Sequence, residues 1–179
     1  PFIDEGSRER LCLVWRSPNQ LGEYVLLRPA AAFEAEWPVL DKAAKYYDYL
    51  PVFPAAGPRI EAGIRYLRDQ GAKRIVLIAH SCSVHMSMEW IRSSGDGGID
   101  AYIGIGMGAT DYGQPMREPF ALDRIDVPVL DLYAENDYGA VRIGRVGHPH
   151  SAQRVIDGAE HYFVDRGGDL VNVIADWLA

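Results

Sequence analysis

Ser81, Asp137 and His161 are the residues whose types and order along the chain best suit catalytic chemistry. Ser81 lies in residues 79–83 (Ala-His-Ser-Cys-Ser), between an apolar, β-branched run and a run with helical spacing. A serine hydroxyl is a poor nucleophile unless a histidine accepts its proton and an acid orients that histidine. An acid and a histidine follow Ser81 in the order Ser, Asp, His, which predicts acyl transfer through a serine nucleophile.

The surroundings of Ser81 predict a strained turn between a strand and a helix. Residues 74–79 (Arg-Ile-Val-Leu-Ile-Ala) are typical of a buried strand, and residues 82–92 place Val84, Met88 and Ile91 on one helical face. Such a turn needs small residues two before and two after the serine, and the usual G-x-S-x-G has glycine there. This chain has Ala79 and Ser83, which are small but not glycine. The turn would place the N–H of Cys82 at the positive end of the helix, where it can stabilise an oxyanion.

Asp137 and His161 are each expected at the carboxyl end of a strand. Asp137 comes just after the predicted strand 127–133, and His161 lies in residues 158–163 (Gly-Ala-Glu-His-Tyr-Phe), between a short strand candidate and the last helix. Because the carboxyl ends of parallel strands meet at one edge of a sheet, the three side chains are expected to come together.

Other interpretations of these residues stay open from the sequence. A serine between a strand and a helix is most often a helix cap, and Asp137 can stabilise a turn. Asp111 is the second choice for the acid. Asp131 lies inside the predicted strand and Glu135 precedes the bend, so both are less suitable.

The remaining histidines and Cys82 fit the chemistry less well. His80 is expected to point away from Ser81, and His85 belongs to the following helix. His148 and His150 flank a proline in a polar stretch and are expected to be exposed. No ligand spacing supports a metal site. Cys82 as nucleophile would lack the small-x-nucleophile-x-small frame of the serine.

From Pro58 onward the chain alternates between helical and strand patterns, which predicts an α/β fold with a mostly parallel sheet flanked by helices. The predicted helices are 58–71, 82–92 and 169–178, and the predicted strands are 74–79, 100–107, 127–133 and 153–156. A Gly- and Pro-rich loop or small lid is expected over 104–120. Residues 1–35 are expected to hold strands of uncertain pairing at 10–15 and 23–27, joined by a turn at 17–20, with a helical piece at 30–35. An irregular aromatic segment at 46–49 would cover the sheet.

Composition narrows the class of protein. The 179 residues are 48% hydrophobic and 24% charged, with a net charge of −7, which predicts a single globular domain over 1–179. The chain has no basic stripe for nucleic acid, no run long enough to span a bilayer, and no secretion-signal pattern in its opening Pro-Phe-Ile-Asp-Glu. Cys12 and Cys82 are too few for a disulfide framework and are expected to be free thiols. Compartment and oligomeric state stay open.

These residues also carry a resemblance to the α/β-hydrolase superfamily, and in particular to a bacterial branch of uncharacterised physiological role. The resemblance covers roughly residues 36 to 179, and its matching stretches are 50–54, 74–83, 104–111, 127–137 and 158–163. It implies a serine hydrolase with Ser81, Asp137 and His161 as its triad, and we expect its substrate to be a small molecule with an ester-like carboxylic bond. It also implies that no metal or organic cofactor is needed.

The sequence departs from the superfamily pattern in two places. The strained turn at residues 79–83, the elbow, lacks both glycines. No His-Gly loop for a second oxyanion donor follows the strand at 24–27, where residues 28–32 read Arg-Pro-Ala-Ala-Ala. Proline has no N–H to donate. The stretch 28–39 is too short for that loop, a helix and a strand, so the fold is expected to be reduced at its N-terminal side. Either the protein has lost a strand–helix unit there, or some of its residues are not in this sequence, and the sequence does not distinguish the two. The alternative function is therefore a catalytically lapsed binding or scaffold module. A flavodoxin-type ligand binder ranks last, because no phosphate-binding glycine loop follows the first strand.

Overall fold

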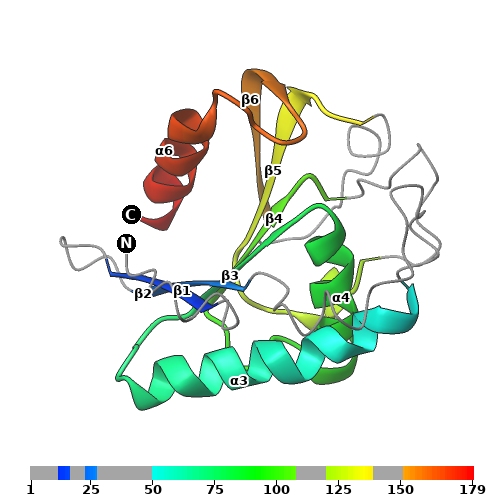
Figure 1. Cartoon of the computed structure of the whole chain (residues 1–179), viewed down its shortest axis with the longest axis vertical. Helices are drawn as coiled ribbons and strands as arrows, with labels where there is room; N and C mark the ends of the chain where they lie inside the picture. Colours follow the sequence, from blue (N-terminus) through cyan, green and yellow to red (C-terminus); the bar gives the residue numbers. More distant parts are fainter. Residues whose placement is uncertain (1–11, 17–22, 28–49, 108–119, 139–150) are drawn as a thin grey trace, which may run out of the picture.

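The computed structural model describes residues 12–16, 23–27, 50–107, 120–138 and 151–179, and helices and strands alternate from residue 50 to the end of β5 (Figure 1). The strands are β1 (Cys12–Arg16), β2 (Glu23–Leu27), β3 (Val76–His80), β4 (Ala101–Ile105), β5 (Val129–Asn136) and β6 (Ser151–Glu160). The helices are α3 (Ala56–Asp69), α4 (Cys82–Ser94) and α6 (Gly167–Leu178), with short 3-10 helices η2 (Leu50–Ala55) and η4 (Leu122–Arg124).

The central sheet has four strands in the order β3-β4-β5-β6, and each neighbouring pair is parallel. All four carboxyl ends therefore lie at one edge of the sheet. β1 and β2 pair antiparallel in a two-stranded sheet of their own. These strands confirm the predicted α/β class with a parallel sheet.

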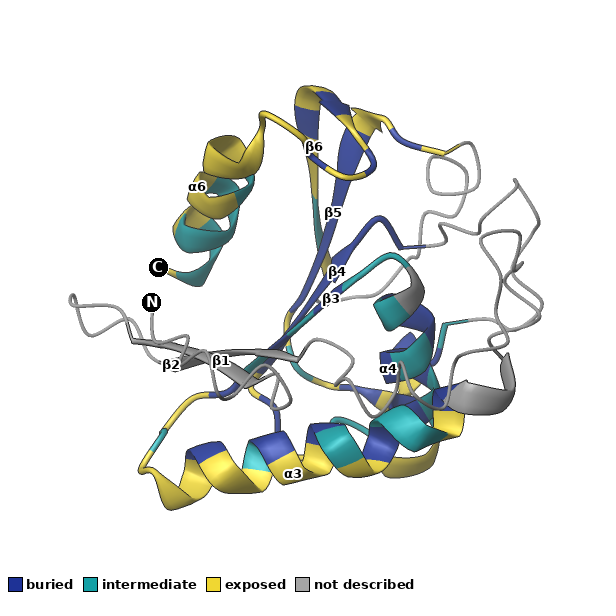
Figure 2. Ribbon diagram, in the orientation of Figure 1, coloured by how far each residue is buried: buried dark blue, intermediate teal, exposed yellow. Residues whose placement is uncertain are grey.

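Helices cover both faces of the sheet, because its strands are apolar on both sides. Ile60 of α3 and Met88 of α4 share a core with Tyr102, whereas the next strand residue, Ile103, belongs to a second core beneath α6. Figures 1 and 2 show α3 and α4 on one side of the buried strands and α6 on the other. In the part of the chain that the structure describes, no helix has the length and hydropathy needed to cross a bilayer.

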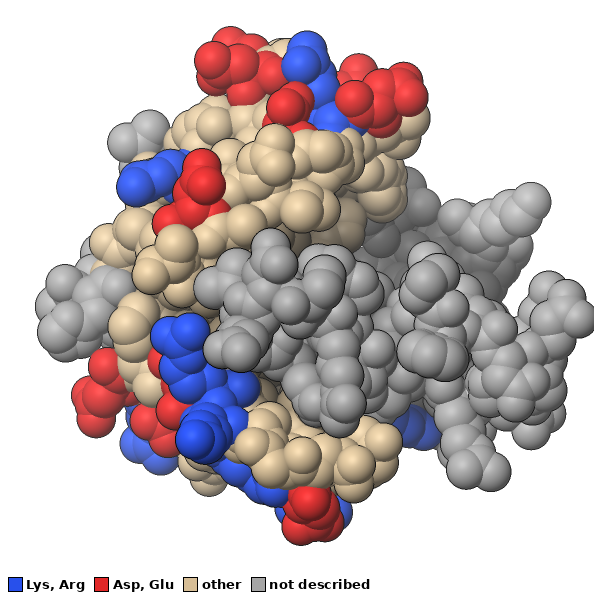
Figure 3. Space-filling view, turned by 90° about the vertical axis from the view of Figure 1, so that its left-hand side faces the viewer, with Lys and Arg blue, Asp and Glu red and all other residues tan. Residues whose placement is uncertain are grey.

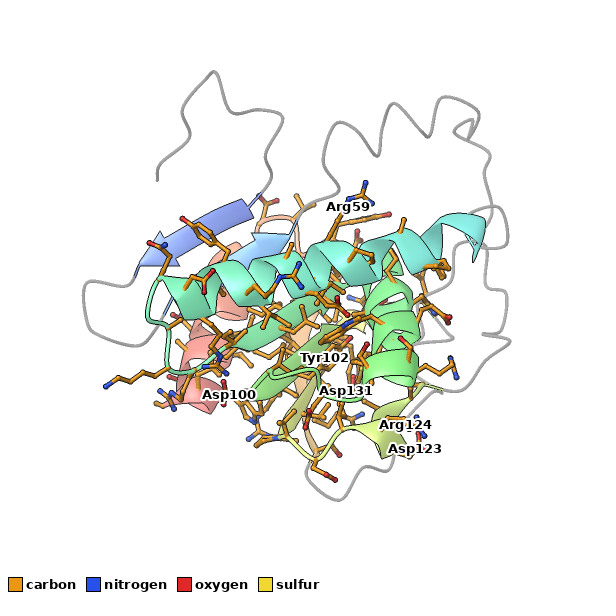
Figure 4. All side chains as sticks on the ribbon, turned by 90° about the horizontal axis from the view of Figure 1, so that it is seen from below. Arg59, Asp100, Tyr102, Asp123, Arg124 and Asp131 are labelled. Atoms are coloured by element: carbon orange, nitrogen blue, oxygen red, sulfur yellow. The ribbon has the colours of Figure 1, made fainter. Side chains whose placement is uncertain are left out.

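Tyr102 is the largest fully buried side chain of the first core, and its hydroxyl is 2.8 Å from Ser87 Oγ on α4. Ser87 Oγ in turn donates to the carbonyl of Val84 at 2.9 Å. Figure 4 shows Tyr102 among the side chains between the ribbons, whereas Arg59 points outward from α3. Burial raises the pKa of Tyr102 above its ordinary range, so the phenol stays neutral in this layer.

Charged side chains of both signs share the surface. Figure 3 shows Lys and Arg side chains lying among Asp and Glu side chains at both ends of the face that it presents. One such pair ties two elements together, because Arg68 on α3 contacts Asp100 before β4 at 3.0 Å. Both partners are exposed, so this ion pair contributes little to stability.

Some predicted boundaries were wrong. β6 covers ten residues where four were predicted. It pairs with β5, and most of its side chains are exposed or half-buried, so its sequence lacks the continuous apolar run by which a buried strand is predicted. β4 ends at Ile105 rather than at Met107, because Gly106 adopts a left-handed φ of 65° that breaks the strand. The helix predicted at 58–71 begins and ends two residues earlier, at Ala56 and Asp69.

Several expectations fall outside the described residues. They are the turn at 17–20, the helical piece at 30–35, the aromatic segment at 46–49, the oxyanion-loop region at 28–39 and most of the loop at 104–120.

Candidate active site

Ser81 occupies the expected junction, directly after β3 and directly before α4. Its backbone angles, φ 56° and ψ −122°, lie in a region that residues other than glycine rarely adopt. Holding a serine in this conformation costs about 1–3 kcal/mol of backbone strain. Two backbone hydrogen bonds hold this turn: the Ser81 N–H donates to the Ile105 carbonyl, and the Val84 N–H donates to the Ser81 carbonyl, both at 2.9 Å. The small residue before the turn, Ala79, is buried and lies opposite Gly104 of β4.

His161 directly follows β6 and reaches Ser81 across the sheet edge. Its Nε2 lies 2.8 Å from Ser81 Oγ, and its Nδ1 lies 2.8 Å from Oδ1 of Asp137. A carboxylate only accepts, so the Nδ1 of a neutral ring donates to Asp137 and the Nε2 lone pair faces the serine hydroxyl. This is the tautomer that a proton acceptor for Ser81 requires.

Asp137 directly follows β5 and is 5% exposed. Besides the His161 ring, its Oδ1 accepts from the Tyr138 N–H at 2.8 Å, and its Oδ2 accepts from the Ala134 N–H at 3.4 Å. A buried carboxylate needs such donors to offset the loss of hydration. The two backbone bonds also fix the carboxylate in the orientation in which it accepts the hydrogen bond from His161 Nδ1–H.

The competing acids lie elsewhere. Asp131 is buried in the middle of β5, where its Oδ2 accepts from Nε2 of Gln153 on β6 at 2.7 Å (Figure 4). Glu135 accepts from the N–H of Gly158 at 2.8 Å. Asp111 lies outside the described residues. The carboxylate that is hydrogen-bonded to the His161 ring is that of Asp137.

Gly106, the residue after β4, lies directly against the histidine and the acid. A Cβ built there would be 3.0 Å from Cε1 and 3.2 Å from Nδ1 of His161, and 3.4 Å from Oδ2 of Asp137. Because its φ is 65°, both the backbone and the space favour glycine. Gly106 was not among the predicted site residues, although a glycine at a strand end is a signal of close approach.

His80, the last residue of β3, also belongs to the site. The sequence predicts that its side chain points away from Ser81. In the structure, its Nε2 lies 2.9 Å from the carbonyl oxygen of His161. The two imidazole rings are 4.9 Å apart. Burial lowers the pKa of His80, although its hydrogen bond to His161 opposes this shift. The alternation of side chains along β3 predicts that the His80 side chain lies on the α6 side of the sheet, because it shares a strand face with Val76 and Ile78, which pack toward α6.

Of the remaining histidines only His85 is among the described residues, and it does not join the group. His85 lies on α4 as predicted, and its ring faces Phe53 and Phe120 at centroid distances of 6.3 and 5.8 Å. His148 and His150 lie outside the described residues. Among the residues that are described, no three His, Cys, Asp or Glu side chains are grouped to hold a metal ion.

Two tyrosines border the histidine. The Tyr138 ring lies 4.5 Å from the His161 ring, and the Tyr162 ring lies 4.9 Å from it. They are 37% and 65% exposed, so both contribute surface beside a site whose inner residues are buried. An apolar group of a ligand can pack on such rings.

Cys82 is the first residue of α4, so its N–H is one of the first N–H groups of the helix, which lack an intrahelical acceptor. Together with the helix dipole, this gives the turn a positive end next to Ser81. The arrangement suits an oxygen that becomes negative during reaction at the serine.

No protein-family model matches the sequence. No curated protein matches it either. Among solved structures, the chain is similar to an alpha-beta serine hydrolase homologue from Coxiella burnetii, with 20% sequence identity, a TM-score of 0.51, and coverage of 67% of this chain and 57% of that one. It also matches a predicted CIB-like hydrolase from Thermoplasma acidophilum, with 17% identity, a TM-score of 0.44, and coverage of 66% and 57%.

The likeness to the Coxiella burnetii structure and the open parallel sheet define the class of fold: the chain has an α/β-hydrolase fold. It spans 57% of the length of that structure. A fold of this kind is shared by proteins of many activities, so the chemistry has to be argued from the site itself.

Proposed function

We propose that the protein is a serine hydrolase that cleaves a carboxylic ester-like bond of a small molecule. Ser81 is the nucleophile, His161 the general base and acid, and Asp137 the residue that orients the histidine. The observation that carries this proposal is the chain of two hydrogen bonds, each 2.8 Å long, from Ser81 Oγ through the His161 ring to Asp137. Ground-state geometry of this length is what proton transfer from hydroxyl to imidazole requires.

In the first half of the reaction, Ser81 Oγ attacks the carbonyl carbon while its proton passes to Nε2 of His161. The carbonyl oxygen becomes an oxyanion, which the N–H of Cys82 stabilises at the start of α4. His161 then gives the proton to the leaving oxygen, the C–O bond breaks, and the acyl group stays on Ser81.

In the second half, His161 takes a proton from water, and the resulting hydroxide equivalent attacks the acyl carbon. The proton returns from Nε2 to Ser81 Oγ as the carboxylic acid leaves. Asp137 stays ionised throughout and stabilises the imidazolium that forms in each half. Each step uses residues of this chain and the two reactants alone.

Aromatic side chains beside the triad support the substrate class. Tyr138 and Tyr162 offer aromatic surface next to His161, which suits an ester with an apolar acyl or alcohol group.

Labelling with a fluorophosphonate tests the proposal, because this reagent bonds covalently to an activated serine. We expect one adduct per chain, mapped by mass spectrometry to Ser81, and no adduct in Ser81→Ala. The wild-type protein should also hydrolyse short p-nitrophenyl esters, whereas Ser81→Ala should not. Folded protein that stays unlabelled at Ser81 would refute the enzyme and support the lapsed binding or scaffold module instead.

A further inference from the structure

His161 is held at three of its polar atoms. Both ring nitrogens are occupied, by Ser81 and Asp137, and its backbone carbonyl oxygen lies 2.9 Å from Nε2 of His80. The residue is 3% exposed, so this carbonyl has little access to water. A buried carbonyl without a donor is costly, which makes the His80 bond a required part of the local structure.

The donor in this bond is the imidazole of His80, since a carbonyl oxygen only accepts. Its Nε2 therefore carries the hydrogen. Burial lowers the pKa of His80, which keeps the ring neutral near pH 7 and leaves one N–H for this purpose. The Nδ1 atom is then the unprotonated nitrogen of the ring.

The position of His80 in the chain gives this bond its consequence. His80 and Ser81 are neighbours, so two successive residues of the elbow contact the same histidine, one at its backbone and the other at its ring. Any shift of the elbow relative to the loop after β6 must stretch both contacts. The rings of His80 and His161 also lie 4.9 Å apart, and the Tyr162 and Phe163 rings pack edge-on to His80 at 6.1 and 6.2 Å.

We propose that His80 is a positioning residue of the active site, which holds His161 at hydrogen-bonding distance from Ser81 by donating Nε2–H to the His161 carbonyl. This inference deepens the proposed function and rests on it as far as catalysis is concerned. His80 touches neither the substrate nor the proton that is transferred. It acts through the placement of His161, where an error of about 1 Å can cost about 100-fold in rate.

Two substitutions separate the hydrogen bond from the ring packing. His80→Gln replaces the ring but can present an amide N–H where Nε2 was. His80→Phe keeps a ring of similar size and removes the donor. If the donated hydrogen bond positions His161, Gln should preserve function and Phe should lose it.

The first readout is the rate of fluorophosphonate labelling at Ser81, together with kcat and KM for ester hydrolysis. We expect His80→Phe to lower the labelling rate and kcat by about 10- to 100-fold with KM changed by less than about threefold, on the scale of misplacement by up to 1 Å. His80→Gln should stay within about fivefold of the wild type. Equal losses in both variants, or a loss confined to KM, would overturn the proposal.

The second readout does not depend on activity. The low-field proton NMR signal of His161 Nδ1–H, which arises from its bond to Asp137, should persist in wild type and His80→Gln and broaden or vanish in His80→Phe. An unlabelled wild type would refute the serine hydrolase, whereas the NMR comparison would still decide the role of His80. An unchanged signal in the Phe variant would contradict that role.

A matched control guards against a loss of folding. Tyr102→Phe also removes one hydrogen bond from a buried ring, that to Ser87, but in the core beneath α4. This variant should keep wild-type labelling and the low-field signal even where its melting temperature falls. If His80→Phe does not fold, His80→Leu removes the donor with a smaller side chain and takes the same two measurements.

Discussion

Gly106→Ala tests whether the site depends on the close approach between the end of β4 and the histidine. The new Cβ would lie 3.0 Å from Cε1 of His161, where carbon atoms in contact prefer about 3.5–4.0 Å, so the ring must move by roughly 0.5 Å. The Nε2–Oγ distance to Ser81 is 2.8 Å, and a shift of this size takes it toward the limit of a useful hydrogen bond.

The expected loss of activity follows from that displacement. Misplacement by about 1 Å can cost about 100-fold, so half of it should cost on the order of tenfold in the labelling rate of Ser81 and in kcat. The left-handed φ of 65° adds a backbone penalty of about 1–2 kcal/mol for alanine, which the lower entropy of the unfolded chain offsets only in part. The free energy of unfolding in urea should therefore fall by about 1 kcal/mol.

Gly71→Ala is the matched control, because Gly71 also has a left-handed φ, of 86°, but a Cβ there meets nothing within 4 Å. Gly71 lies between the end of α3 at Asp69 and the start of β3 at Val76. This variant should lose a similar amount of stability and label at the wild-type rate. The reasoning is refuted if Gly106→Ala labels as fast as wild type, or if both glycine variants lose activity equally.

Three further perturbations probe other parts of the structure. Asp137→Asn should lower kcat by roughly 10⁴-fold, because an amide can hold His161 in the wrong tautomer, and a loss below tenfold in ester hydrolysis would argue against Asp137 as the orienting acid. The pKa of His80 in the folded chain is lowered from its ordinary value of 6.5, so the unfolded chain binds the proton first as the pH falls. The contribution of neutral His80 to stability is therefore present above about pH 6.5 and is lost as the pH falls through the folded-state pKa. Unfolding curves between pH 8 and 5 should accordingly be less pH-dependent for His80→Gln, and identical pH dependence would contradict the assignment. Tyr102→Phe should lower the free energy of unfolding by about 1 kcal/mol, since Ser87 Oγ loses its donor in a buried layer; a variant as stable as wild type in urea would show that this bond contributes nothing net.

The sequence was informative where one physical rule dominates. Buried parallel strands need apolar side chains on both faces, so β3 and β5 stood out, and Ser81 and Asp137, which directly follow them, became candidates from their residue types, order and position. The edge strand β6 exposes much of its length, and only its centre gave a strand signal.

Other features depend on distances between elements, which spacing along the chain does not contain. The bond from His80 to the His161 carbonyl joins residues 81 positions apart, and the closeness of Gly106 to the His161 ring joins residues from different strand ends. A glycine after a strand and a histidine before a serine each have ordinary explanations on their own. Their roles became visible only when β3, β4 and β6 were set in order.

That order also poses a geometric problem, which the site solves. Ser81 follows β3 and His161 follows β6, and these strands are three spacings apart in the sheet, about 14 Å at roughly 4.8 Å per strand. Yet the side chains meet at 2.8 Å. The shift in register between β5 and β6 at Ala134 and Asn136, and the left-handed φ of 67° at Gly158, mark where β6 departs from a regular strand.

The imidazole then has to cross the ends of β5 and β4 to reach the serine. Asp137 at the end of β5 accepts the hydrogen bond from its Nδ1–H, and at the end of β4 the ring lies directly against the position that a Cβ of residue 106 would take. The residue that directly follows each of the four strands thus belongs to the site. In the order β3, β4, β5 and β6, these residues are Ser81, Gly106, Asp137 and His161. A glycine at residue 106 therefore lets the ring approach the sheet edge closely, because any Cβ there would lie 3.0 Å from Cε1 of His161.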